Sequence, residues 1–191
     1  MPRRSAAAAL ETRRAIVDRA VDVASVDGLD GLTIGRLAGE LEMSKAGVIG
    51  HFGTKEKLQL ATLERAIATF RREVWEPAAG LDPGLERLRA IAAAWISYLE
   101  RDVFPGGCFL TAASTEWDGR EGPVRDAVRQ TLGLWHDVLA AEAARAGLDD
   151  PGQVAFEMNS IAMGLNQALQ LDLEPKKAPA RARKAMGRLL A

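Results

Sequence analysis

The feature that most constrains the fold is a pair of short capped segments separated by a tight turn, within residues 33–52. Thr33 is a good N-cap, and apolar residues follow it at the i, i+3, i+4, i+7 spacing of one helix face: Ile34, Leu37, Ala38 and Leu41. Glu42 and Met43 form the turn, and Ser44 can cap a second short helix. Two short helices joined by a tight turn make a helix-turn-helix unit.

The rest of the chain also favours helices. Alternating β-branched runs between turn pairs are missing from the sequence, so we predict an all-α fold. Apolar stripes predict one helix before the pair and longer helices after it, over residues 11–26, 55–76, 85–99, 124–146, 153–172 and 180–190. We expect the helix that begins near residue 55 to end before Pro77, because proline disrupts a helix interior. We place a domain boundary near Thr54, with residues 1–54 in one domain and 55–191 in the other.

Composition excludes several classes of protein. The 191 residues are 48% hydrophobic and 27% charged, which is ordinary for a globular domain and too apolar for a disordered chain. One cysteine and two histidines argue against an internal disulfide or a metal site, and we expect no cofactor. No apolar run approaches the roughly 20 residues that span a bilayer, and the N-terminus does not read as a signal peptide. We therefore expect a cytoplasmic protein without a membrane segment.

The glycine-rich stretch SKAGVIGHFGTKEKL raises the alternative of a phosphate-binding loop in an enzyme. A P-loop needs a strand, then GxxxxGK[ST], then a helix, because the glycines let backbone N–H groups surround the phosphates. Here the order is Gly-Thr-Lys, the spacing fails, and a capped helix precedes the glycines. His51 has no carboxylate or nucleophile near it in a recognisable motif. We expect no catalytic residue, and the alternative is an α-helical carrier or enzyme whose helix-turn-helix is incidental.

A helix-turn-helix unit places its second helix in the major groove of DNA. The small residues Gly47 and Gly50 would let the backbone approach the groove, and Lys45 can reach a phosphate or a guanine edge. The helix N-termini at Thr33 and Thr54 offer N–H groups to phosphate oxygens. The predicted DNA-binding residues are Thr33, Ser44, Lys45, Ala46, Gly47, His51 and Lys55.

Each of these residues also has a purely structural explanation. Lys45 can be an ordinary solvated lysine, Gly47 can relieve crowding within its helix, and His51 can pack against a neighbouring helix. Arg3 and Arg4 can form a basic arm that reaches the minor groove, or a tail without contacts. These alternatives stay open at the level of the sequence.

Residues 12–58 resemble the N-terminal domain of the tetracycline-repressor (TetR) family of transcriptional regulators. The resemblance rests on residue types at fixed spacing: Ile16, Ala20, Gly28, Thr33, Leu37-Ala38, Met43-Ser44, His51-Phe52 and Lys55-Glu56. One position departs, because the family usually has an aromatic residue, most often Tyr, where this chain has Ile49. In the family that Tyr commonly contacts a phosphate, so we assign Ile49 to packing. Residues 104–128 resemble the ligand-binding domain of one branch of the family.

The resemblance implies a three-helix DNA-binding domain, residues 1–54, and a helical effector-binding and dimerisation domain, residues 55–191. Aromatic residues at helical spacing belong to a core more often than to a pocket, but the resemblance favours an effector cavity lined by some of them. The predicted lining residues are Trp95, Tyr98, Trp117, Trp135, Met158 and Asn159.

The helix over residues 153–172 carries apolar residues on two faces, which implies burial on two sides. We expect one face to pack within the subunit and the other against a second copy. An isologous dimer through the last two long helices would place two reading helices roughly 34 Å apart on a pseudo-palindromic operator. The basic cluster over residues 176–188 is interpreted as a solvated helix face. The resemblance implies a transcriptional repressor that a small apolar ligand releases from double-stranded DNA.

Overall fold

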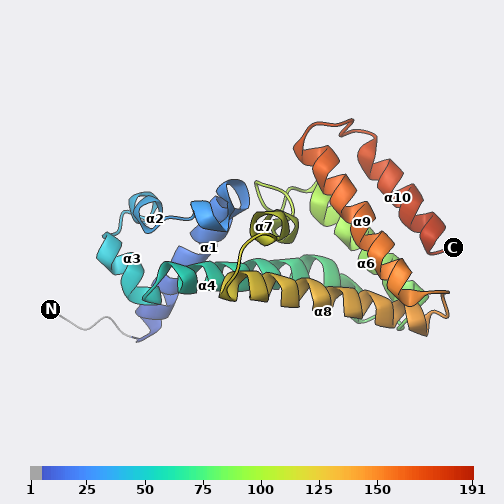
Figure 1. Ribbon diagram of the computed structural model, residues 1–191, viewed down its shortest axis with the longest axis horizontal. Helices are drawn as coiled ribbons and strands as arrows, with labels where there is room; N and C mark the ends of the chain where they lie inside the picture. Colours follow the sequence, from blue (N-terminus) through green and yellow to red (C-terminus); the bar gives the residue numbers. More distant parts are fainter. Residues whose placement is uncertain (1–5) are drawn as a thin grey trace. The chain divides into compact units, whose positions relative to one another are not determined.

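The computed structural model describes residues 6–191, and every regular element within that range is helical (Figure 1). The predicted all-α fold is confirmed. The elements are α1 (Ala6–Gly31), α2 (Ile34–Glu40), α3 (Lys45–Phe52), α4 (Lys55–Phe70), the π-helical η1 (Arg71–Trp75), α5 (Glu76–Ala79), α6 (Leu85–Glu100), α7 (Phe109–Trp117), α8 (Pro123–Arg145), α9 (Pro151–Gln170) and α10 (Ala178–Leu189).

The chain forms two compact units, and we describe each by itself. The first unit holds the residues up to Ala66 together with Phe104–Ala127, and the second holds Ile67–Val103 with Val128–Ala191. The first unit therefore contains α1 to α3, most of α4, and α7. A functional boundary at residue 54 stays a prediction, because compactness does not say which residues bind DNA or ligand.

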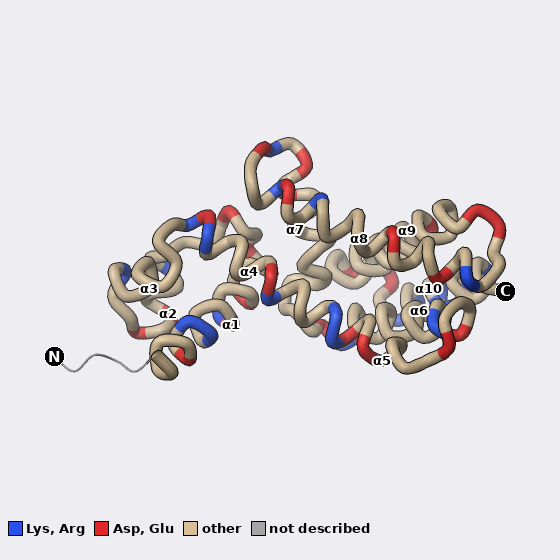
Figure 2. The backbone as a smooth tube through the Cα atoms, turned by 90° about the horizontal axis from the view of Figure 1, so that it is seen from below, with Lys and Arg blue, Asp and Glu red and all other residues tan. Residues whose placement is uncertain are grey.

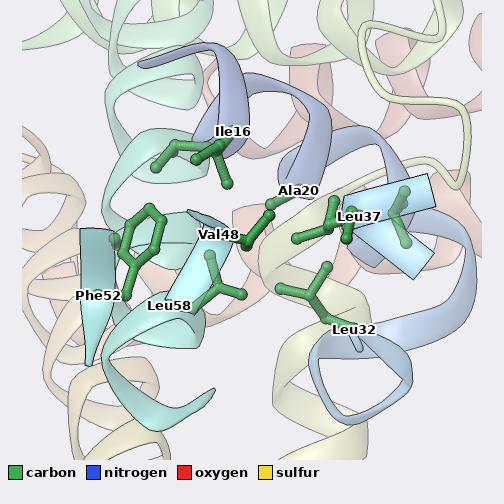
Figure 3. Close-up of a cluster of buried hydrophobic side chains, with 11 residues drawn as sticks. Ile16, Ala20, Leu32, Leu37, Val48, Phe52 and Leu58 are labelled. Carbon is green, nitrogen blue, oxygen red and sulfur yellow. The ribbon is translucent and has the colours of Figure 1, made fainter. Parts of the chain in front are cut away.

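The core of the first unit positions the two short helices. Buried side chains from α1, α2, α3 and the start of α4 meet in one cluster (Figure 3). Its members are Ile16, Val17, Ala20, Val23, Leu32, Leu37, Ala38, Val48, Phe52, Leu58 and Ala61. Burying one large aliphatic side chain contributes about 1.5–3 kcal/mol, so this cluster is sufficient to fix α2 and α3 against α1.

Three side chains cap the helices of this unit as the sequence predicts. Thr33, Ser44 and Thr54 each accept a hydrogen bond from the backbone N–H three residues further on, at 3.2, 3.0 and 3.1 Å respectively. Each cap satisfies one of the N–H groups that the first turn of a helix leaves without an intrahelical partner. The predicted caps are confirmed, and they fix where α2, α3 and α4 begin.

α1 bends where the sequence predicts its end. Gly28 has φ +79° and ψ 164°, which interrupts the helix before its last residues. Positive φ is a conformation that residues with a side chain rarely adopt. The bend turns the backbone of Leu29 and Asp30 towards α7.

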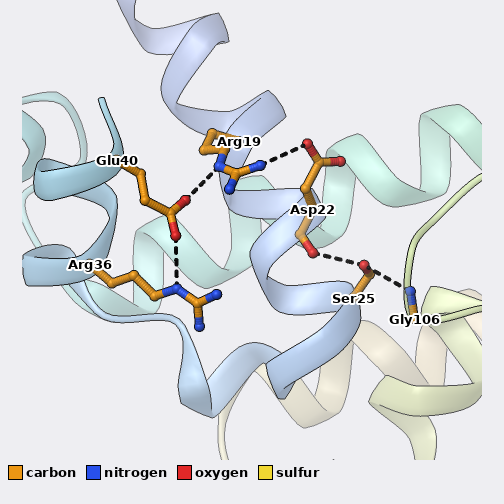
Figure 4. A network of polar contacts seen from close by, with 6 residues as sticks. All are labelled: Arg19, Asp22, Ser25, Arg36, Glu40 and Gly106. Carbon is orange, nitrogen blue, oxygen red and sulfur yellow. Dashed lines mark hydrogen bonds and ion pairs between the residues drawn. The ribbon is translucent and has the colours of Figure 1, made fainter. Parts of the chain in front are cut away.

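α7 belongs to the first unit because it packs on this end of α1. The backbone N–H of Gly106, just before α7, donates to Ser25 Oγ at 3.3 Å (Figure 4). A Cβ atom at Gly106 would lie 1.7 Å from the carbonyl oxygen of Ser25, so only glycine allows this approach. Two backbone segments that are 81 positions apart in the chain thus come into direct contact.

The expectation that a helix ends before Pro77 is wrong. The helical path continues through the π-helical η1 into α5, where Pro77 occupies the first turn. A proline in a first turn loses nothing, because the N–H that it lacks has no intrahelical acceptor there. The wider turn of η1 lets the N–H of Glu76 bond to the carbonyl of Arg71.

In the second unit, α6, α9 and α10 pack on one another, and α9 and α10 run side by side (Figure 1). A buried carboxylate, Glu142 of α8, accepts hydrogen bonds from Gly84 N at 2.7 Å and from Arg87 Nη1 at 3.1 Å. Arg145 Nη1 lies 2.6 Å from the same carboxylate. This network joins the turn before α6 to α8.

None of the helices in the described part of the chain combines the length and apolar composition needed to span a bilayer. Among residues 6–191 there is also no group of three or more His, Cys, Asp and Glu side chains that could hold a metal ion.

Candidate functional site

The outward face of α3 is small and exposed. Lys45, Ala46 and Gly50 are exposed, whereas Val48 and Phe52 are buried in the core of the first unit. The buried pair fixes the rotation of the helix, and beyond Lys45 the exposed residues Ala46 and Gly50 carry little bulk. A helix presented in this way can approach another surface with its backbone.

Lys45 is the first residue of α3 and forms no ion pair with any residue in the range 6–191. Its side chain runs past Gly35 of α2, where an added Cβ would lie 3.3 Å from Lys45 Cε. The ammonium therefore stays available to an anion outside the chain.

Gly47 is half-buried, and an added Cβ would lie 3.2 Å from Ser44 Oγ. Its lack of a side chain thus makes room for the cap of α3. At Gly50, an added Cβ would meet nothing within 4 Å, so the space outside α3 is open there. Ile49, between them, is half-buried.

His51 lies near the end of α3 and is half-buried. Its carbonyl oxygen accepts a hydrogen bond from Arg13 Nη1 at 2.8 Å, and the Arg13 guanidinium lies 4.3 Å from the centre of the Phe52 ring. Arg13 of α1 thereby holds the end of α3. A contact between the His51 imidazole and DNA stays a prediction.

Lys55 is not free. Its Nζ donates to the Asp30 carbonyl oxygen at 2.6 Å and to Asp30 Oδ1 at 3.2 Å. The other carboxylate oxygen of Asp30 lies 3.1 Å from Arg120 Nη1. The predicted phosphate contact by Lys55 would therefore have to compete with, or share, an internal carboxylate.

Other cations of this unit are also held by carboxylates, as Figure 4 shows for Arg19 and Arg36. Both guanidinium groups donate to the carboxylate of Glu40, and Arg36 also pairs with Asp27. Hydrogen bonds from Arg36 and Arg19 lower the pKa of the Glu40 carboxyl below its ordinary value. Lys and Arg are accordingly interspersed with Asp and Glu along the backbone (Figure 2). Sequence reasoning missed this network, although the i, i+4 spacing of Arg36 and Glu40 is a visible signal for part of it.

Arg3 and Arg4, considered as a basic arm, lie outside the described residues.

The second unit holds an aromatic cluster centred on Phe70. Its ring meets those of Trp95, Tyr98 and Trp135 edge to face, with centroids 5.7, 5.5 and 5.1 Å apart. The Trp95 and Trp135 rings are 5.5 Å from one another. The structure thus brings together three of the predicted lining residues. It adds Phe70, which sequence reasoning had assigned to a helix stripe alone.

Two polar atoms in this cluster are buried without an acceptor. Trp95 Nε1 and Trp135 Nε1 have no hydrogen-bond partner among the residues that the structure describes. Buried indole N–H groups usually have a partner. Apolar rings that carry a few unpaired polar groups are the usual chemistry of a small-molecule site.

The other predicted lining residues are Trp117, Met158 and Asn159. Trp117 belongs to the first unit, and Met158 is fully buried in α9. Asn159 is half-buried and donates from Nδ2 to Met163 Sδ at 3.2 Å. A ligand contact by any of these residues stays a prediction.

One face of α9 exposes large apolar side chains. Phe156 is 61% exposed and Met163 is 37% exposed. A groove of about 380 Å³ lies between α9 and α10, lined mostly by small and apolar residues that include Gly164, Ala168 and Ala182, with Glu174 and Arg181 also in its lining. An apolar face of this kind is a typical protein-binding surface.

Comparison with known proteins gives consistent results. Residues 16–62 match the family described as "Bacterial regulatory proteins, tetR family", and residues 84–186 match "Tetracyclin repressor-like, C-terminal domain". A search of curated proteins finds no match.

Solved structures of the same fold include a TetR transcriptional regulator from Chloroflexus aurantiacus J-10-FL, with 23% identity, a TM-score of 0.83, and coverage of 95% of this chain and 93% of that one. A TetR-family transcriptional regulator from Streptomyces coelicolor has 22% identity, a TM-score of 0.80, and coverage of 94% and 95%. AibR, solved in complex with isovaleryl coenzyme A and operator DNA, has 23% identity, a TM-score of 0.68, and coverage of 81% and 85%.

Proposed function

Because the chain belongs to the TetR family of bacterial transcriptional regulators, we propose that it represses transcription as a homodimer and leaves its operator when a small apolar molecule binds. One observation supports the DNA-binding part above the others. α3 presents Lys45, Ala46 and Gly50 outward, while a buried core fixes its orientation. This is the geometry that lets a recognition helix enter the major groove.

The proposed DNA contacts are Lys45 and the backbone of α3 in the groove, with the capped starts of α2 and α4 near phosphates. Thr33, Ser44 and Ala46 are exposed at these positions, and Gly47 and His51 are half-buried beside them. Lys55 contacts a phosphate when its Nζ leaves the Asp30 carboxylate. Phosphate contacts position the helix, and contacts to base edges give the sequence preference.

We place the effector against the aromatic cluster of Phe70, Trp95, Tyr98 and Trp135. Its apolar rings favour an apolar molecule, and the indole N–H groups of Trp95 and Trp135 favour one with oxygen or nitrogen acceptors. AibR, which shares the fold, is described with both a small molecule and operator DNA, which supports a regulator that binds both. The ligand would shift the population towards a form with lower affinity for the operator.

We place the dimer contact on the exposed apolar face of α9, because a second copy would cover Phe156 and Met163. The family acts by binding DNA and not by catalysis, and we extend that to this chain. A regulator of bacterial genes works where the chromosome lies, so we propose a cytoplasmic location.

Selection from random-sequence DNA tests the function. The full-length protein should enrich a pseudo-palindrome with half-sites about 10 base pairs apart, centre to centre. It should bind that duplex with a dissociation constant of about 10 nM or tighter at physiological salt, and binding should weaken steeply as salt rises. A carrier or enzyme with an incidental helix-turn-helix would enrich no sequence.

The same duplex serves to find the effector. Small apolar molecules with carbonyl groups are added to the preformed complex, and release is followed by fluorescence anisotropy. A molecule that releases the wild type but not the Trp95→Phe variant would support the proposed site, whereas equal release of both would contradict it.

A further inference from the structure

Arg120 follows α7 in the first unit and touches two very different groups. Its guanidinium lies 4.8 Å from the centre of the Trp117 ring. Its Nη1 lies 3.1 Å from Asp30 Oδ2. One cation therefore connects an aromatic ring of α7 to a carboxylate at the end of α1.

Asp30 stands between two cations. Its Oδ2 faces Arg120, and its Oδ1 faces Lys55 Nζ at 3.2 Å. Hydrogen bonds from Arg120 and Lys55 lower the pKa of the Asp30 carboxyl below its ordinary value, so this group is ionised at neutral pH. Lys55, at the start of α4, is one of the proposed phosphate contacts.

We propose that Arg120 is a relay that sets how strongly Asp30 withholds Lys55 from DNA, so that a change at Trp117 alters the affinity for the operator. The inference rests on the proposed function, because it assigns a means of regulation to the same DNA-binding surface. Arg120 and Asp30 are positioning residues in this scheme, since both act through Lys55.

The physical basis is competition between anions. A DNA phosphate and the Asp30 carboxylate both attract the Lys55 ammonium. While Arg120 balances part of the Asp30 charge, Asp30 attracts Lys55 less strongly. When Arg120 turns away, Lys55 is the only cation left to Asp30, and the phosphate competes less well. For side chains this exposed, the effect on affinity should be about two- to fivefold.

The backbone around Asp30 is held firmly, so that the relay acts on side chains. The carboxylate of Glu116 accepts hydrogen bonds from Leu29 N at 2.8 Å and Asp30 N at 2.7 Å. An added Cβ at Gly28 would lie 2.8 Å from that carboxylate, so the glycine makes room for it. The end of α1 is thus anchored to α7, and Asp30 cannot drift from Lys55 and Arg120.

Trp117 supplies an input to this relay. Its Nε1 is buried and has no hydrogen-bond acceptor in the described part of the chain, and Arg120 covers its ring. Any movement of the Trp117 ring would change the position of the guanidinium that covers it. The cation stacked on the ring would then lose its geometry towards Asp30.

The test measures affinity for the duplex selected by the wild type, by fluorescence anisotropy with full-length protein. Arg120→Gln should weaken binding by about two- to fivefold, and Asp30→Asn should tighten it by a similar factor. The double variant Arg120→Gln/Asp30→Asn should bind like Asp30→Asn alone, because Arg120 acts only through the Asp30 carboxylate, which is then missing. Arg120→Lys keeps a cation near Asp30 and should restore most of the wild-type affinity.

Two controls match these changes in charge and exposure. Arg125→Gln removes a side chain that is 40% exposed, against 41% for Arg120. Asp18→Asn removes a carboxylate that is 53% exposed, like that of Asp30, but releases Arg65 in place of Lys55. Both controls should change the affinity less than the relay variants.

The proposed relay is contradicted if Arg120→Gln weakens binding by the same factor in the wild type and in the Asp30→Asn variant. It is also contradicted if Arg120→Gln weakens binding no more than Arg125→Gln does. In either case the operator would still bind the wild type, and the proposed function would stand. If the wild type selects no sequence at all, the proposed function itself fails.

Discussion

At the scale of single residues, Lys45 gives the sharpest test of how α3 meets DNA. It is exposed and forms no ion pair with residues 6–191, so its removal leaves no partner group uncompensated. Lys45→Ala should weaken operator binding and, if Lys45 contacts a phosphate, reduce the salt slope by about 1 per contact. The melting temperature and the dimer should not change.

Lys176→Ala is the matched control, since Lys176 is also exposed and lies outside the helix-turn-helix. It should bind the operator like the wild type. Equal binding by Lys45→Ala and the wild type would show that α3 does not dock through its first residue.

Residue-scale prediction from sequence succeeded where the interaction is local. The caps at Thr33, Ser44 and Thr54 each act within three residues, so the residue type and its place before an apolar stripe were enough. The partner of Lys55 could not be predicted in the same way. Asp30 lies 25 positions before Lys55, and no spacing rule reports a contact across that distance.

At the scale of elements, the buried carboxylate of Glu142 joins α8 to the turn before α6. Burial opposes ionisation, but hydrogen bonds from Gly84 N–H and Arg87 outweigh it, and the pKa of Glu142 falls below its ordinary value of 4.5. A lowered pKa in the folded state stabilises the fold above pH 4.5, and that contribution is lost as the pH falls through the lowered value.

Glu142→Gln should lower the free energy of unfolding by about 1–3 kcal/mol at pH 7, because buried donors lose a charged acceptor. Thermal melts from pH 7 to pH 3 should show the difference from wild type shrinking below pH 4.5. Glu174→Gln is the control, since that carboxylate also has a lowered pKa but is exposed. A difference that does not depend on pH would contradict the assignment.

The helices themselves were largely predictable, because apolar stripes repeat along them. The segment around Pro77 could not be predicted in this way. Proline disrupts the interior of a helix, but Pro77 lies in the first turn of α5.

At the scale of the whole molecule, the exposed face of α9 predicts a dimer. Phe156→Glu would replace a large apolar side chain of the proposed interface with a charge, and the dimer should weaken by roughly 30-fold or more. Sedimentation velocity across a range of protein concentrations measures this. Leu10→Glu on α1 is the control, because Leu10 is 54% exposed against 61% for Phe156 and lies in the first unit. A Phe156→Glu variant that remains as dimeric as the control would place the interface elsewhere.

The fold class and the family could be predicted from sequence, because both depend on short-range patterns in residues 12–58 and on helix periodicity. The membership of α7 in the first unit could not. Gly106 meets Ser25, and Glu116 meets Leu29, across 81 and 87 positions of the chain. Such long-range contacts arise from packing and leave no periodic signal.

Because Glu116 of α7 bonds to the end of α1, the helix-turn-helix of this protein is difficult to transfer alone into another protein. A chimera that joins residues 1–54 to the ligand-binding domain of another protein would leave the N–H groups of Leu29 and Asp30 without an acceptor. In this chain the Glu116 carboxylate of α7 accepts both hydrogen bonds. An engineer would have to transplant residues 104–127 as well, or choose a host whose own helix offers a carboxylate at that place. The DNA-binding unit of this regulator therefore depends on two separate segments of the sequence.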